Sequence, residues 1–262
     1  MSKKDHLYSA RWAITKAINE NDFGSILDYA ADSIIQAKAD SITGEVEEDR
    51  PNTTDKDIED REKYTIPEIV VVPGVKFKKR GRYKTATGFA KGLVVHYTVS
   101  GKTKKSAKSV LNYLAKKGLG CMVMDEDGII YIPQSFDLDE EWASHAGDSA
   151  WKGKNWLSKY LMGMEICCWG KLNSTTEKRA DVIRSHSGKD NIKKGLYEAY
   201  TMSPGQEDSL KNFILWQLDI NPEFSLDWVV GHDEIAPKRK SDPGASLSRS
   251  MPEFREYIKS LI

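Results

Sequence analysis

Two histidines of this sequence stand at the ends of short apolar runs that favour β-strands. His96 follows Leu93-Val-Val95, and His232 follows Trp228-Val-Val-Gly231. A strand end is a place where a rigid scaffold meets a cleft, so both imidazoles can be held at one site. A single such histidine would more often have an ordinary hydrogen-bonding role. Two of them in matching contexts favour a shared metal ion.

The segment after His232 brings a carboxylate to the same place. Pro237 restricts the backbone there, and Pro243 keeps Asp242 out of helical geometry. In an extended stretch Lys240 and Asp242 point to the same side, because they are two residues apart. One carboxylate and one ammonium group are therefore expected in the same small volume.

Two imidazoles and one carboxylate form a ligand set typical of catalytic zinc, which leaves the fourth position open for water. The residues therefore predict a Zn²⁺ site made of His96, His232 and Asp242, with ligand distances of about 2.0–2.2 Å. Asp233 is a poorer candidate, since it follows His232 directly in an extended segment and should face the other way. The other histidines, expected to be dispensable for metal binding, are His6, His145 and His186.

The rest of the sequence predicts the elements that position these residues. Apolar or β-branched runs indicate strands at 68–72, 92–98, 122–124, 129–132, 161–168 and 228–231. Apolar residues at helical spacing indicate helices over 106–117 and 204–218, and Ser203 can cap the second one. Residues 173–195 are polar and are expected to form an irregular surface excursion. Strands mixed with helices predict a mixed α/β fold, in which a central, mostly β-sheet layer is flanked by helices.

The first 65 residues differ from the rest in pattern and charge. Residues 1–44 contain two amphipathic stretches, which predict a helical N-terminal appendage. Residues 45–65 are acidic and poor in apolar side chains, which indicates a linker. We therefore expect a catalytic domain over residues 66–262 that folds and binds zinc without the preceding residues.

The composition is that of an ordinary globular protein. Lys+Arg and Asp+Glu balance at 39 each, so the total charge favours no partner. Three cysteines without C-x-x-C spacing argue against a disulfide framework or a cysteine zinc site. No apolar run is long enough to cross a bilayer, and the polar start has no apolar signal core. A monomer made in the cytoplasm, without a secretory signal and without membrane insertion, is the expectation.

Five segments together carry a family resemblance. They are Leu93-Val-Val-His-Tyr-Thr98, Ala143-Ser-His-Ala-Gly-Asp-Ser-Ala-Trp151, Met162-Gly-Met-Glu-Ile166, Tyr200-Thr-Met-Ser-Pro-Gly-Gln206 and Gly231-His-Asp-Glu-Ile-Ala-Pro-Lys-Arg-Lys-Ser-Asp-Pro-Gly244. In this order they resemble segments of the type 2 N-acetylmuramoyl-L-alanine amidases, and the last one resembles the C-terminal zinc motif of that family. The family includes a bacterial recycling amidase, many phage endolysins and the animal peptidoglycan recognition proteins. The resemblance covers roughly residues 66–262 and implies an amidase-like, peptidoglycan-recognition-like fold.

The resemblance also implies roles for individual residues. His96, His232 and Asp242 correspond to the zinc ligands of the family. Glu165 corresponds to its general base, and Lys240 to the electrophilic partner of the oxyanion. The physical reading agrees, because the carboxylate of Glu165 on an apolar strand must face a cleft or be buried at a cost.

Further candidates come from the segment that resembles one wall of the family's substrate groove. His145, Trp151 and Asn155 are expected to contact substrate there. For His145 three roles stay open: a hydrogen bond to substrate, support of Glu165, or bracing of its loop. A role as a fourth ligand is disfavoured, since it would close the position that water needs.

The implied activity is zinc-dependent cleavage of the amide bond between N-acetylmuramic acid and L-alanine in peptidoglycan. Residues 69–124 contain thirteen Lys or Arg and no Asp or Glu. This basic stretch suits a polymeric anionic wall and favours a phage-type endolysin that acts after holin-dependent release. A cytoplasmic muropeptide-recycling amidase and a secreted interbacterial effector stay open. A non-catalytic peptidoglycan-binding module is disfavoured because the zinc set is complete, and no nucleic-acid partner is expected because no nucleic-acid motif accompanies the basic stretch.

Overall fold

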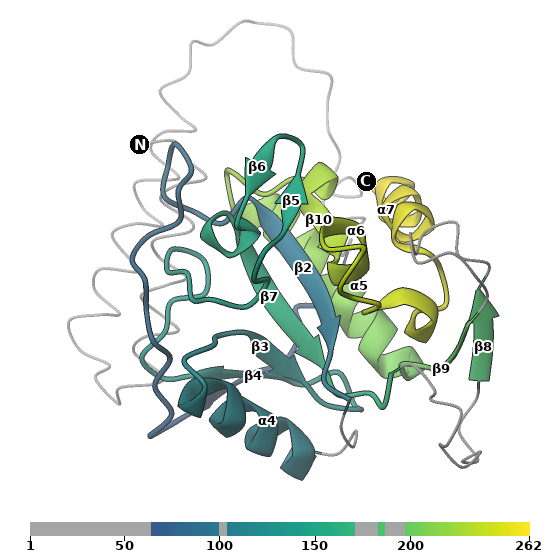
Figure 1. Ribbon diagram of the computed structural model, residues 1–262, viewed down its shortest axis with the longest axis horizontal. Helices are drawn as coiled ribbons and strands as arrows, with labels where there is room; N and C mark the ends of the chain where they lie inside the picture. The colour runs from purple at the N-terminus through teal and green to yellow at the C-terminus, as the bar shows by residue number, and fades with distance from the viewer. Residues whose placement is uncertain (1–63, 100–103, 171–182, 187–196) are drawn as a thin grey trace, which may run out of the picture. The chain divides into compact units, whose positions relative to one another are not determined.

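The computed structural model describes residues 64–99, 104–170, 183–186 and 197–262 (Figure 1). The predicted helical appendage (1–44) and nearly all of the predicted acidic linker (45–65) lie outside these residues. Most of the described chain belongs to one compact unit, made of residues 66–218 and 223–262. In the described part, no helix combines the length and the apolar character needed to cross a membrane.

A six-stranded sheet forms the centre of this unit. In spatial order its strands are β1 (Ile69–Val72), β4 (Ile130–Pro133), β3 (Met122–Met124), β7 (Leu161–Ile166), β2 (Gly92–Tyr97) and β10 (Val229–Gly231). Neighbouring strands are parallel, except for the antiparallel pair β3 and β4. All six strands coincide closely with runs predicted from the sequence, so the mixed α/β class is confirmed.

Strand β2 determines which residues meet at the site. It pairs with β10 so that Gly231 lies beside Val95. His232, the next residue, therefore follows the register to a position next to His96. On the other side β2 pairs with β7, and there His96 lies directly beside Glu165. Register partners in a parallel sheet point to the same face, so three polar side chains gather at one end of three adjacent strands.

Helices cover the sheet. They are α4 (Lys104–Lys116), α5 (Pro204–Ile220), α6 (His232–Ile235) and α7 (Met251–Lys259), with short 3₁₀ turns η1 (Leu157–Lys159), η2 (Leu226–Trp228) and η3 (Gly244–Ser246). Helix α4 packs on β3 and β4, where Leu111 joins Val123 and Tyr131 in a buried cluster. Helix α5 lies behind β2 and β7 in the view of Figure 1. Its predicted N-cap is confirmed, because the backbone N of Gln206 donates to Ser203 Oγ at 3.1 Å.

The structure differs from the sequence predictions in three places. The region expected to be an irregular excursion contains strand β8 (Ile183–His186), which pairs with β9 (Tyr197–Tyr200). Helix α7 was not predicted, although Ser250 and Glu253 form a capping box at its start. The segment after His232 begins as the short helix α6, so the extended backbone expected at Asp233 is wrong. A two-stranded hairpin, β5 (Ala150–Trp151) and β6 (Lys154–Asn155), completes the unit.

Candidate metal centre and active site

His96, His232 and Asp242 form a compact group that we call the ligand cluster. Their exposed fractions are 1%, 2% and 6%. The two Nδ1 atoms lie 2.7 Å apart, and Asp242 Oδ2 lies 3.1 Å from His96 Nδ1 and 3.0 Å from His232 Nδ1. The structure thus brings together the three residues predicted as zinc ligands. Ligand atoms of a tetrahedral zinc stand about 3.3 Å apart, so the edge between the two Nδ1 atoms needs to open by about 0.6 Å and the two edges to Asp242 by about 0.2–0.3 Å.

Local contacts hold Asp242 in this position. The backbone N of Asp233 donates to the carbonyl of Asp242 at 2.8 Å, which joins the first turn of α6 to the loop that follows it. Tyr97 Oη and Ser241 Oγ lie 2.9 Å apart, which connects the same loop to β2. Asp233 itself belongs to neither group of residues that the described chain offers to a metal ion.

The outer nitrogens of both histidines indicate where their protons are. His232 Nε2 lies 3.1 Å from the carbonyl of Ala146, which can only accept, so this nitrogen carries the proton. His96 Nε2 lies 3.1 Å from His145 Nδ1, and His145 Nε2 lies 2.9 Å from the carbonyl of Leu161. The proton on His145 is therefore on Nε2, and His96 donates from Nε2 to His145 Nδ1.

These tautomers leave a lone pair on Nδ1 of both cluster histidines. Burial, followed by the neighbouring His232, lowers the pKa of His96 to about 4 against the opposing effect of Asp242. Burial also lowers the pKa of His145 to about 3, with His96 as the next cause. The rings of His96 and His145 are therefore neutral near pH 7. Two imidazole lone pairs and a carboxylate oxygen within about 3 Å repel one another unless a cation joins them, so the residues present fit a divalent metal such as zinc.

A second group of potential ligands overlaps the first. His96, Cys121 and His145 bring their donor atoms within 4.8 Å of one another. The facing nitrogens of the two histidines already form a hydrogen bond in this group. Burial raises the pKa of the Cys121 thiol, which keeps it protonated and makes it a poor ligand. The ligand cluster is therefore the better metal site. No spacing motif in the sequence indicates that Cys121 lies close to these two histidines.

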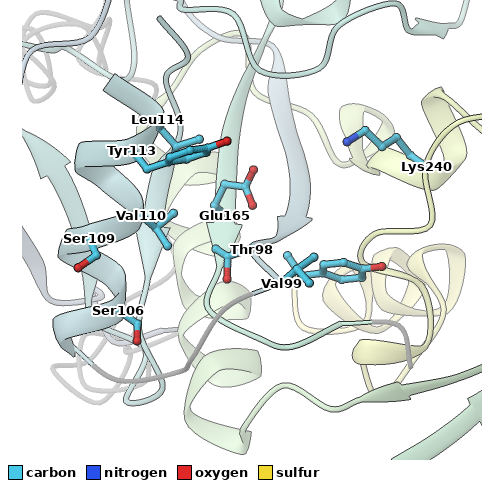
Figure 2. Close-up of a pocket in the computed structure, with 10 residues that line it drawn as sticks. Thr98, Val99, Ser106, Ser109, Val110, Tyr113, Leu114, Glu165 and Lys240 are labelled. Atoms are coloured by element: carbon cyan, nitrogen blue, oxygen red, sulfur yellow. The ribbon is translucent and has the colours of Figure 1, made fainter. Parts of the chain in front are cut away.

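Beside the ligand cluster lies a pocket of about 650 Å³ (Figure 2). Glu165 and Lys240, which we call the pocket pair, both line it. Helix α4 contributes one wall through Ser109, Val110 and Tyr113, and Lys240 extends toward Glu165 from the loop after α6. An elongated substrate can therefore lie between α4 and this loop, next to the ligand cluster.

The surroundings of Glu165 suit a group that accepts a proton. Its Oε2 atom is buried and has no hydrogen-bond partner among the described residues. Burial, followed by the negative charge of Asp242, raises the pKa of Glu165 to about 8 against the opposing effect of Lys240. A carboxylate with a raised pKa and an unsatisfied oxygen at a pocket is suited to take a proton near neutral pH.

The three predicted substrate contacts lie outside the lining of this pocket. Trp151 is half-buried, and its Nε1 donates to the carbonyl of Asp227 at 3.0 Å. Asn155 is exposed on β6. Both ring nitrogens of His145 have partners within the protein. Their predicted contacts with substrate therefore stay predictions.

Comparisons with known proteins were made for the whole chain. The model of the N-acetylmuramoyl-L-alanine amidase family matches residues 86–245, which is more than half of the chain. The search of the curated proteins found no match.

Three solved structures are similar to parts of the chain. AmiD from E. coli, in complex with anhydro-N-acetylmuramic acid-L-Ala-D-gamma-Glu-L-Lys, is 24% identical, with a TM-score of 0.41 over 59% of this chain and 52% of that chain. This protein thus spans about half the length of AmiD. A selenomethionine derivative of AmpD is 18% identical, with a TM-score of 0.43 over 75% of this chain and 94% of that chain. The endolysin amidase LysCS from Clostridium intestinale is 14% identical, with a TM-score of 0.44 over 75% and 98% of the two chains.

The family match and the geometry of the site agree. The matched residues include the whole ligand cluster and the pocket pair. Because the match extends over more than half of its length, the chain belongs to the N-acetylmuramoyl-L-alanine amidases, a family of peptidoglycan amidases.

Proposed function

We propose that this protein is a zinc-dependent endolysin-type amidase that cleaves the bond between N-acetylmuramic acid and L-alanine in intact cell walls. The observation that carries the proposal is the convergence of three lone-pair donors beside Glu165, whose buried Oε2 atom has no hydrogen-bond partner among the described residues. The donors are His96 Nδ1, His232 Nδ1 and Asp242 Oδ2. Zinc held by them would lower the pKa of a bound water to about 7 and polarise the amide carbonyl.

The pocket pair supplies the proton transfer and the charge compensation. Glu165 accepts a proton at its carboxylate as water adds to the amide carbonyl carbon. Lys240 places its ammonium group where the carbonyl oxygen becomes negative, which stabilises that charge. Glu165 then returns the proton to the nitrogen of L-alanine as the C–N bond breaks. The products are the lactyl carboxylic acid of the sugar and a peptide with a free amino terminus.

A basic surface segment supports the choice of an intact wall as substrate. The segment exposes six basic side chains, while Phe77 and Tyr83 between them and Val75 before them are buried. The six are Lys76, Lys78, Lys79, Arg80, Arg82 and Lys84. Lys79 forms an ion pair with Glu141, and Arg82 forms one with Glu140. The other four have no ion-pair partner among the described residues, so the segment keeps a positive charge that attracts anionic polymers.

One experiment tests the reaction and the substrate class together. Purified sacculi and soluble anhydro-muropeptides are incubated with the protein, with and without a chelator, and the new termini are identified. We expect new L-alanine amino termini, no new sugar reducing ends, loss of activity with chelator, and faster turnover of sacculi. Faster turnover of the soluble muropeptides would instead favour the recycling amidase, and new reducing ends would refute the amidase reaction.

A further inference from the structure

The loop of residues 143–147 lies behind both histidines of the ligand cluster, and we call it the support loop. The side chain of His145 accepts from His96 Nε2, and the carbonyl of Ala146 accepts from His232 Nε2. We propose that His145 is a positioning residue of the metal centre, which fixes the tautomer and the ring orientation of His96 so that Nδ1 presents its lone pair to the metal. This inference rests on the proposed zinc site and deepens it.

A chain of three groups transmits this constraint. The carbonyl of Leu161, at the start of β7, accepts from His145 Nε2 at 2.9 Å. The neutral ring then has its lone pair on Nδ1, which accepts from His96 Nε2 at 3.1 Å. The rings of His96 and His145 stand nearly perpendicular, at 89° with centroids 5.4 Å apart. A backbone carbonyl of the sheet thus decides which nitrogen of His96 faces Asp242 and His232.

The fold makes room for His145 at this place. A Cβ atom added to Gly163 of β7 would lie 2.7 Å from His145 Nδ1 and 2.6 Å from Cys121 Sγ, so a larger residue would displace the ring. The support loop is also fastened from behind, because Ser158 Oγ accepts from the backbone N of His145 at 3.0 Å and from that of Ala146 at 2.9 Å. Several contacts therefore hold the ring of His145 in its position.

These contacts favour a positioning role for His145 over the other roles that the sequence left open. Both ring nitrogens of His145 are engaged, so neither remains for a hydrogen bond to substrate. The residue does not line the pocket, and no hydrogen bond joins it to Glu165 among the described residues. Sequence alone predicted that zinc binding does not need His145. The hydrogen bond to His96 argues that it does, since outer partners of metal-binding histidines typically change metal affinity about 10–100-fold.

A pair of isosteric variants tests the role of the acceptor. His145→Asn keeps an oxygen at the position of Nδ1, whereas His145→Leu has the same shape and no acceptor there. Zinc affinity is measured by competition with a chromogenic chelator, and the Co²⁺-loaded proteins are compared by their visible absorption spectra. We expect His145→Leu to bind zinc about 10–100-fold more weakly and to change the Co²⁺ spectrum. We expect His145→Asn to stay close to the parent in both measurements.

Three results would overturn the inference, and they separate it from the proposed function. Equal losses in the two variants would show that the ring matters only for its shape, and an unchanged affinity in His145→Leu would show that it does not matter. Failure of the parent protein itself to bind zinc would refute the proposed metal site as well.

A measurement on the parent protein remains decisive even if a variant does not fold. In zinc-loaded protein with ¹⁵N-labelled histidine, we expect the proton of His145 on Nε2 and the proton of His96 on Nε2. A proton on Nδ1 of His145 would contradict the proposed chain.

Discussion

His96 of the ligand cluster and Glu165 of the pocket pair lie side by side on β2 and β7, yet the fold satisfies the polar atoms of the two groups differently. Around the ligand cluster, each outer nitrogen has a partner within the support loop. In the pocket pair, Glu165 keeps an oxygen without a partner among the described residues. Hydrogen bonds to the outer nitrogens fix the geometry of the ligand cluster for a metal. The unsatisfied oxygen of Glu165 stays available to a reacting molecule. The two groups should therefore respond differently to the same kind of substitution.

The largest effect is expected from removing the charge of a ligand. Asp242→Asn should abolish tight zinc binding and with it essentially all amidase activity, because a neutral amide is a poor zinc ligand. Zinc content after dialysis and the release of L-alanine termini measure both effects. Asp233→Asn is the control, since it replaces a buried carboxyl group two residues after the end of β10 that belongs to neither group of potential ligands. Zinc loss in the control, with retention in Asp242→Asn, would reverse the assignment of the ligand.

A smaller effect, limited to turnover, is expected in the pocket pair. Glu165→Gln should lower kcat about 10²–10⁴-fold and Lys240→Met about 10²–10³-fold, with zinc affinity unchanged in both. Each removes a group that acts on the reacting atoms and leaves the ligand cluster intact. Lys238→Met, in the same loop but exposed, should have nearly normal turnover. If Glu165→Gln lost its zinc, the distinction between the two groups would fail.

The unusual ionisation of Glu165 predicts an effect of pH on the stability of the metal-free protein. Its pKa is about 8 in the folded chain, against a reference value of 4.5, because burial disfavours the charged form. Between these values the folded state binds more protons than the unfolded state, so its contribution to stability falls as pH rises. Glu165→Gln should therefore stabilise the metal-free protein more at pH 8 than at about pH 5.5. Urea unfolding at the two pH values measures this, with the exposed Glu126→Gln as control.

The smallest effects are expected at the hairpin of β5 and β6. Trp151→Phe removes the hydrogen bond to the carbonyl of Asp227 and should cost about 0.5–1.5 kcal/mol of stability, with little change in KM. Asn155→Ala should leave stability unchanged, because the side chain is exposed, and should raise KM a few-fold if the hairpin touches substrate. Unfolding free energies and KM for sacculi fragments distinguish the two. A rise in KM for Trp151→Phe alone would place the tryptophan against substrate.

Much of this site was predictable because it depends on local patterns. The apolar runs before His96 and His232 predicted two strand ends. The parallel pairing of β2 with β10 places these two ends side by side. The sequence did not reveal that β2 lies between β7 and β10, so the adjacency of Glu165 and His96 rested on the family resemblance. Strand β8 was missed because its polar composition resembles that of a loop. For His145 a substrate contact, support of Glu165 and bracing of its loop all stayed open, since hydrogen bonds between distant segments leave no spacing pattern in the sequence.

The separation of the ligands along the chain has a consequence for biosynthesis. His96 and Asp242 are 146 residues apart, and β10 occupies the edge of the sheet beside β2. The metal centre can assemble only after the ribosome has released the segment through Asp242 and β10 has docked as the edge strand. Contacts between such distant segments form late in folding, since their loops are costly to close. The nascent chain therefore has no complete ligand cluster until Asp242, 146 residues after His96, has been synthesised.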